Sequence, residues 1–140
     1  MKIMVIGSMA FAKEMVKTKQ TLEAMGHDVA VPADIETHLA NEGFVDDLDG
    51  NLQYATETDI MRQCFGLVAA SEAVLVLNHP RKGIQGYIGT SALMEIGIAY
   101  YLGKKIFLLH AVPHYNEVRW AHEITIINPT IIQGDLNKIK

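Results

Sequence analysis

The feature that most limits the possible folds is the run AVLVLN at residues 73–78, whose first five residues are all apolar. A strand with one solvent-exposed face alternates apolar and polar residues, whereas a strand inside a parallel sheet is apolar throughout because helices cover both faces. This run therefore predicts a central strand. Other short β-rich segments lie between helical or loop segments, so we expect a five-stranded, mostly parallel sheet with strands near residues 2–6, 28–31, 73–78, 105–110 and 130–133.

The segments between these strands favour helices. Residues 10–25 carry apolar side chains on one side and end before Gly26, and residues 90–102 end before Gly103, as helices with a C-terminal glycine do. Right-handed crossovers place such helices on both faces of the sheet, which predicts a doubly wound α/β fold of the flavodoxin or Rossmann-like kind. Two more helices are expected, one capped by Thr56 or Thr58 and running to about residue 70, the other at residues 116–126.

Residues 33–52 interrupt this alternation of strands and helices. They contain Asp34, Glu36, Glu42, Asp46, Asp47 and Asp49, which is most of the acidic excess, together with two glycines. We expect an excursion or lid here and not an element of the core. Ligands of parallel α/β sheets bind beyond the carboxyl ends of the strands, so the loops after residues 6, 31, 78 and 110 are expected to gather at one functional edge.

Length and charge restrict the partners of the chain. Its 140 residues fit one domain, residues 1–140. The net charge is −4 and no run of Lys and Arg exceeds two residues, so we expect no nucleic-acid partner. No charge-free stretch approaches the ~20 apolar residues of a membrane span, which predicts a soluble protein with no membrane partner. The single cysteine excludes an internal disulfide and favours a cytoplasmic location.

Glu95 is the most informative single residue, because it is the only charged residue between Lys82 and Lys104. None of the residues three or four positions away carries a charge that would neutralise it on a helix. Burial without a partner raises the pKa of a carboxyl group and marks a candidate nucleophile or general acid. An equally open alternative is a glutamate that binds backbone amides of a neighbouring loop or lies at a subunit interface.

Two loops at the expected functional edge offer groups for a ligand. The first loop opens a helix after the first strand, where amides and a hydroxyl suit an anion. The second follows the central strand with basic side chains and a glycine-rich turn, which suits a phosphate or a sugar. A plain turn and a solvated basic loop are the ordinary alternatives. The candidate substrate-binding residues are Gly7, Ser8, Met9, Asn78, Arg81, Lys82, Gly86, Gly89, Thr90 and Ser91.

No motif in the chain predicts a cofactor or a metal. The sequence contains neither the GxGxxG dinucleotide fingerprint nor a P-loop, which disfavours NAD and ATP hydrolysis. His110, His114 and His122 with Glu117 lack the spacing of a zinc site. We therefore expect no cofactor and no metal.

In these elements the chain resembles the nucleoside 2-deoxyribosyltransferase superfamily, which includes the deoxynucleoside monophosphate N-glycosidases. The resemblance covers most of the chain and rests on KIMVIGS, AVLVLN, the glycine-rich loop and GTSALMEIGIAYYLGKKIFLL. The last segment is the most specific, since family members show a glycine-rich turn, then Glu-(Leu/Ile)-Gly, an alanine, and Gly-Lys before a strand.

The resemblance implies roles for two carboxylates. In that family a glutamate attacks C1′ of the deoxyribose and releases the base, which makes Glu95 the nucleophile. A family aspartate on the preceding helix assists departure of the base, and Asp59 is the matching candidate. Taken by itself, Asp59 near a helix start is more often explained as a cap that the helix dipole favours.

Three functions of different kinds remain open. The leading hypothesis is an enzyme that cleaves or transfers at the N-glycosidic bond of a nucleoside or its 5′-monophosphate. The others are a non-catalytic nucleotide-binding sensor on the same scaffold and an interaction module without a small ligand. The segment 92–102 is apolar on nearly every side, which predicts a homo-oligomer, a dimer or larger. The resemblance implies the same, because family members complete their sites with residues of a neighbouring subunit.

Overall fold

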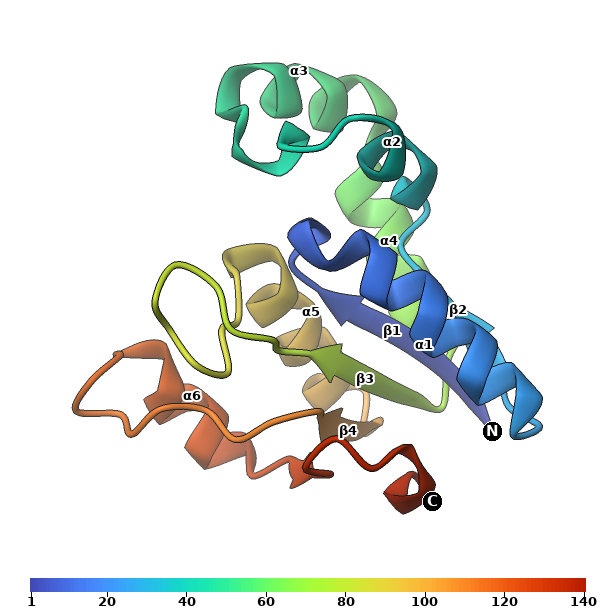
Figure 1. Cartoon of the computed structure of the whole chain (residues 1–140), viewed down its shortest axis with the longest axis vertical. Coiled ribbons are helices and arrows are strands. Elements are labelled where there is room, and N and C mark those ends of the chain that lie inside the picture. Colours follow the sequence, from blue (N-terminus) through green and yellow to red (C-terminus); the bar gives the residue numbers. More distant parts are fainter.

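The computed structural model describes all residues from 1 to 140 and contains one five-stranded sheet (Figure 1). Its strands are β1 (Lys2–Gly7), β2 (Asp28–Ala30), β3 (Ala73–Leu77), β4 (Lys105–Leu108) and β5 (Thr130–Ile131). They lie in the order β2-β1-β3-β4-β5, and every neighbouring pair is parallel. The predicted α/β sheet is confirmed, with β3 in the centre and buried at every residue.

Helices cover both faces of the sheet, which gives the chain two hydrophobic layers. Helix α1 (Ala12–Ala24) packs on one face, where alternate strand residues such as Val5 and Leu75 point. Helices α4 (Ile60–Ala69), α5 (Thr90–Tyr101) and α6 (Trp120–Ile127) contribute to the layer on the other face. No helix of the structure is both long and apolar enough to cross a membrane.

The segment expected to be a lid is helical. It contains α2 (Ile35–Ala40), a 3-10 turn (Phe44–Asp46) and α3 (Leu48–Thr58). Helix α2 buries Ile35 in the same hydrophobic layer as α1, whereas Figure 1 shows α3 beyond one end of the sheet. We call residues 34–58 the cap. The expected helix start at Thr56 or Thr58 is wrong. Thr58 is the last residue of α3, and Asp59, with φ of 50°, interrupts the helical backbone before α4 begins at Ile60.

The other element boundaries differ from the predicted ones by a few residues. The strand expected at 105–110 ends at Leu108, and the helix expected from residue 116 begins at Trp120. The last strand is only two residues long. Short apolar segments specify that a strand exists more strongly than where it ends, because pairing with the neighbouring strand sets the end.

Candidate active site

A cavity of about 390 Å³ lies between the carboxyl edge of the sheet and the cap. This volume falls in the range of small-molecule sites. Its wall combines three parts of the chain: the loop after β1, the cap with the start of α4, and the loop that opens α5. The lining includes Gly7, Ser8, Met9, Asp34, His38, Asp46, Cys64, Arg81, Lys82, Tyr87, Gly89, Thr90, Ser91 and Glu95.

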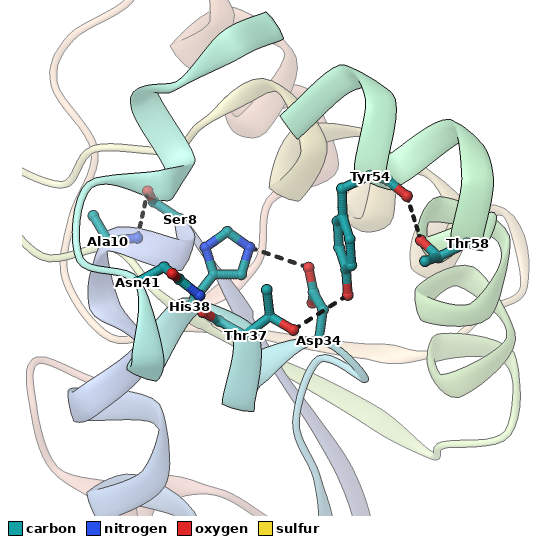
Figure 2. Close-up of polar contacts among 8 residues, drawn as sticks. All are labelled: Ser8, Ala10, Asp34, Thr37, His38, Asn41, Tyr54 and Thr58. Atoms are coloured by element: carbon teal, nitrogen blue, oxygen red, sulfur yellow. Dashed lines mark hydrogen bonds and ion pairs between the residues drawn. The ribbon is translucent and has the colours of Figure 1, made fainter. Parts of the chain in front are cut away.

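The loop after β1 approaches the end of β3 closely at Gly7. A Cβ atom at this position would lie 2.8 Å from the carbonyl oxygen of Leu77, and φ is 153°, so a side chain there is strained. Ser8 follows and accepts a hydrogen bond from the Ala10 amide at 3.2 Å through Oγ (Figure 2). Ser8 thereby caps the 3-10 turn Met9–Phe11, and its hydroxyl proton remains available to donate to a ligand.

Glu95 projects from the buried side of α5, in line with Ala92 and Ala99. It is 7% exposed, and its Oε2 atom is buried without any hydrogen-bond partner. Burial is the main reason that the pKa of Glu95 is raised from 4.5 to about 7, and the negative charge of Asp34 raises it further. A buried carboxyl oxygen without a partner costs stability, and such a group at a cavity wall is available to a ligand.

Asp34 and His38 form a buried pair at the base of the cap. Asp34 directly precedes α2, is 9% exposed, and its Oδ2 atom lies 3.1 Å from Nε2 of His38, one helical turn on (Figure 2). His38 is 6% exposed, and its ring packs against that of Phe44 with centroids 5.4 Å apart. The ring of Phe44 in turn contacts Tyr54. These contacts hold the Asp34 carboxyl group in one place beside the cavity.

The only cysteine of the chain, Cys64, lines the same cavity from α4. Its pKa is raised to about 11, first by burial and then by the charges of Glu95 and Asp34, while a hydrogen bond with the Ala33 backbone acts in the opposite direction. The thiol therefore stays protonated at neutral pH and is a weak nucleophile.

Basic side chains on the loop before α5 bind the cap. Arg81 donates from Nη2 to both carboxylate oxygens of Asp46, at 2.9 and 2.7 Å, and Nζ of Lys82 lies 3.4 Å from Asp46 Oδ1. The hydrogen bond raises the pKa of Arg81 and lowers the pKa of Asp46. The guanidinium of Arg81 also lies 5.6 Å from the ring centroid of Tyr87. The side chains of Arg81 and Lys82 both line the cavity, and both contact the same carboxylate of the cap, that of Asp46.

The structure brings most of the expected site residues to this cavity. Glu95 lines it together with the loop after β1 and the first residues of α5. The residues that it brings together are Gly7, Ser8, Met9, Arg81, Lys82, Gly89, Thr90, Ser91 and Glu95.

Three expected residues are not in the cavity wall. Asp59 is largely exposed at the break between α3 and α4, where its Oδ2 atom accepts from Arg62 Nε at 2.9 Å. Asn78 is fully buried, and its side-chain amide is satisfied because it donates to the carbonyl oxygen of His110 and accepts from the backbone amide of His110. Gly86 packs so closely on Ala111 that a Cβ atom there would overlap the carbonyl oxygen. Asn78 and Gly86 thus join the loops after β3 and β4.

Sequence reasoning missed Asp34, His38 and Cys64. A signal existed for the first two, since Asp34 follows the second strand at the functional edge and His38 stands four residues later, a spacing that puts both on one side of a helix. No comparable signal marks Cys64. In the structure no group of three or more His, Cys, Asp or Glu side chains is arranged to hold a metal ion.

Comparisons with known proteins support the fold. No family model matches the chain, and no curated protein matches its sequence. Among solved structures it is similar to the CMP N-glycosidase BcmB of Clostridium botulinum, with 15% identity, a TM-score of 0.53, and coverage of 96% of this chain and 90% of that chain. At this identity the similarity shows that the two proteins share a Rossmann-like α/β fold, and it assigns no role to any residue of this chain.

Proposed function

We propose that this chain is a member of the nucleoside 2-deoxyribosyltransferase superfamily that cleaves the N-glycosidic bond of a nucleoside or its 5′-monophosphate. The observation that carries the proposal is Glu95, a carboxyl group 7% exposed whose Oε2 atom has no partner within the protein and which lines a cavity of about 390 Å³. The similarity to a structure described as a CMP N-glycosidase supports the same class of reaction.

Glu95 acts as the nucleophile in this proposal. Its carboxylate attacks C1′ of the sugar, the C1′–N bond breaks, and its electron pair leaves with the base. Water, or the nitrogen of a second base, then displaces the carboxylate from C1′ and regenerates it. Because the pKa of Glu95 is about 7, the ionised, reactive form increases across neutral pH.

The groups around Glu95 suit a sugar phosphate. The first amides of α5 lie at Gly89, Thr90 and Ser91, none of them is covered by a capping side chain, and helix N-termini attract anions. Arg81 and Lys82 add positive charge at the same wall. These features favour a 5′-monophosphate over a free nucleoside.

We also propose that residues 1–140 act as one domain within a homo-oligomer in the cytoplasm. Large apolar side chains are exposed on α3 and at the end of α5, including Leu48 at 76%, Leu52 at 67% and Tyr101 at 86%. Light scattering at micromolar concentration tests the oligomer, and a monomer contradicts it.

Release of free base tests the proposed reaction directly. The protein is incubated with a panel of nucleosides, deoxynucleosides and their 5′-monophosphates, and products are separated by chromatography. We expect release from at least one compound and its loss in Glu95→Gln, while Glu117→Gln, a substitution of an exposed glutamate outside the cavity, retains it. Binding in a thermal-shift assay without any base release contradicts the enzyme and favours the sensor.

A further inference from the structure

We infer that Asp34, positioned by His38, takes the proton from Glu95 and delivers it to the departing base. This inference rests on the proposed function and assigns to the reaction a catalytic residue from the cap. Asp59, for which a role in base departure was expected, is exposed and bound to Arg62 outside the cavity wall. The carboxyl group that shares the cavity with Glu95 at the base of the cap is Asp34.

The placement of Asp34 meets the requirements of a proton carrier. It is 9% exposed, lines the cavity, and directly precedes α2, and Glu95 lines the same cavity from α5. Figure 2 shows the His38 ring pointing toward the Asp34 carboxyl, with Nε2 3.1 Å from Oδ2. His38 thus fixes one carboxyl oxygen of Asp34 and leaves the other for a ligand or for Glu95.

The reaction needs such a group for two reasons. A nucleophilic Glu95 must be free of its proton, and burial with the charge of Asp34 raises the pKa of Glu95 to about 7, which favours the protonated form. A nucleobase leaves poorly as an anion, so a proton delivered to a ring nitrogen speeds its departure, and general acids of this kind contribute about 10²–10⁴-fold. One proton moving from Glu95 through Asp34 to the base meets both needs.

The steps balance in atoms and charge. Asp34 accepts the proton of Glu95, and the Glu95 carboxylate bonds to C1′ while the C1′–N bond breaks. The base leaves with the electron pair and takes the proton from Asp34, so it leaves neutral. Water then attacks C1′, its proton passes to Asp34, and the ester bond to Glu95 opens to restore the carboxylate. The net change is hydrolysis to a free base and a sugar with a hydroxyl group at C1′.

Other titratable groups at this cavity fit the role less well. Burial raises the pKa of Cys64 to about 11, which makes its thiol a poor acid at neutral pH. Asp46 is held by Arg81 and Lys82. Tyr87 lies against the Arg81 guanidinium on the loop before α5. Asp34 is therefore the carboxyl group at the wall, besides Glu95, that no cation of Arg or Lys binds.

Paired substrates that differ in their need for a proton test this role. The pairs are dGMP with 7-methyl-dGMP and dCMP with N3-methyl-dCMP, because a methylated base that is already cationic leaves as a neutral molecule without protonation. For the pair that the wild type cleaves, we expect Asp34→Asn to lower the single-turnover rate of base release from the unmethylated substrate about 10²–10⁴-fold. This rate reports cleavage of the C1′–N bond alone, because the later attack of water, in which Asp34 also takes a proton, does not enter it. On the methylated substrate we expect the single-turnover rate of base release to fall less than about tenfold, as for a general acid that is no longer needed.

Two further variants and one spectroscopic readout complete the design. His38→Gln is expected to show the same difference between substrates with a smaller loss, and Asp49→Asn, an exposed aspartate on α3 outside the cavity, is expected to behave as wild type. Carbon-13 NMR of the Glu95 carboxyl measures its pKa without substrate. This pKa should fall in Asp34→Asn, because one of the two causes that raise it is the charge of Asp34.

The outcomes separate this inference from the proposed function. Equal losses on both substrates of a pair, or full activity of a folded Asp34→Asn, overturn the role of Asp34 and leave the N-glycosidase intact. An unchanged pKa of Glu95 in Asp34→Asn also counts against the shared proton. A wild type that cleaves none of the four compounds and no member of the nucleoside panel overturns the proposed function and the inference together.

Discussion

Glu95→Gln should make the protein more stable at alkaline pH, because the native fold buries a carboxyl group that resists ionisation. The pKa of Glu95 is raised from 4.5 to about 7 by burial and by the charge of Asp34. At about 1.4 kcal/mol for each tenfold change in proton affinity, this difference corresponds to about 3 kcal/mol. Glutamine has nearly the same shape and never ionises, so the variant avoids this cost.

The sign follows from which state binds the proton more tightly. Below pH 4.5 the carboxyl is protonated in the folded and the unfolded chain, and wild type and variant differ little. Between pH 4.5 and about 7 the folded state keeps its proton while the unfolded state loses it, so the wild type loses stability as the pH rises. Above pH 7 the full difference of about 3 kcal/mol is reached.

Urea unfolding at pH 5 and pH 8 measures this effect. We expect the variant to exceed the wild type by less than about 1 kcal/mol at pH 5 and by about 3 kcal/mol at pH 8. Glu117→Gln serves as the matched control, since Glu117 is exposed, and should show no such pH dependence. A Glu95→Gln effect that is the same at both pH values, or a destabilised variant at pH 8, refutes the reasoning that Glu95 is a buried carboxyl with a raised pKa.

Three further substitutions or reagents probe the cavity and its walls. Labelling of Cys64 by a maleimide, followed by mass spectrometry, should be slow at pH 7 and rise about tenfold per pH unit up to pH 9, because the pKa of the thiol is about 11; a rate that does not depend on pH contradicts this. Asp46→Asn should free the Arg81 guanidinium and strengthen binding of a nucleoside 5′-monophosphate relative to the free nucleoside in calorimetry, and an equal change for both would be evidence against a phosphate contact. Gly86→Ala should lower the free energy of unfolding by about 1–3 kcal/mol, since φ is 69° and the new methyl group overlaps the Ala111 carbonyl; an unchanged melting temperature would contradict the close packing of these loops.

The sheet could be predicted from sequence because each strand carries its own signal. The apolar run 73–78 requires cover on both faces wherever it lies, and the structure places β3 in the centre with neighbours on either side. The lack of charged neighbours around Glu95 could also be read from a short segment, since it depends only on the residues one helical turn away. By contrast, Asn78 and Gly86 were expected to bind a ligand because they lie in a polar loop. In the structure they instead join the loop after β3 to His110 and Ala111, which follow β4.

The sequence by itself determined the parallel α/β fold and singled out Glu95, because burial of a continuous apolar strand and the lack of a charged neighbour are properties of short segments. Only the tertiary structure decided which groups surround Glu95. Asp34 and Arg81 follow two different strands and meet because parallel strands deliver their loops to one edge, while Cys64 reaches the same cavity from helix α4. The backbone break at Asp59, with its left-handed φ of 50°, turns that aspartate to solvent. Such encounters depend on the geometry of crossovers and caps, which no short segment encodes alone.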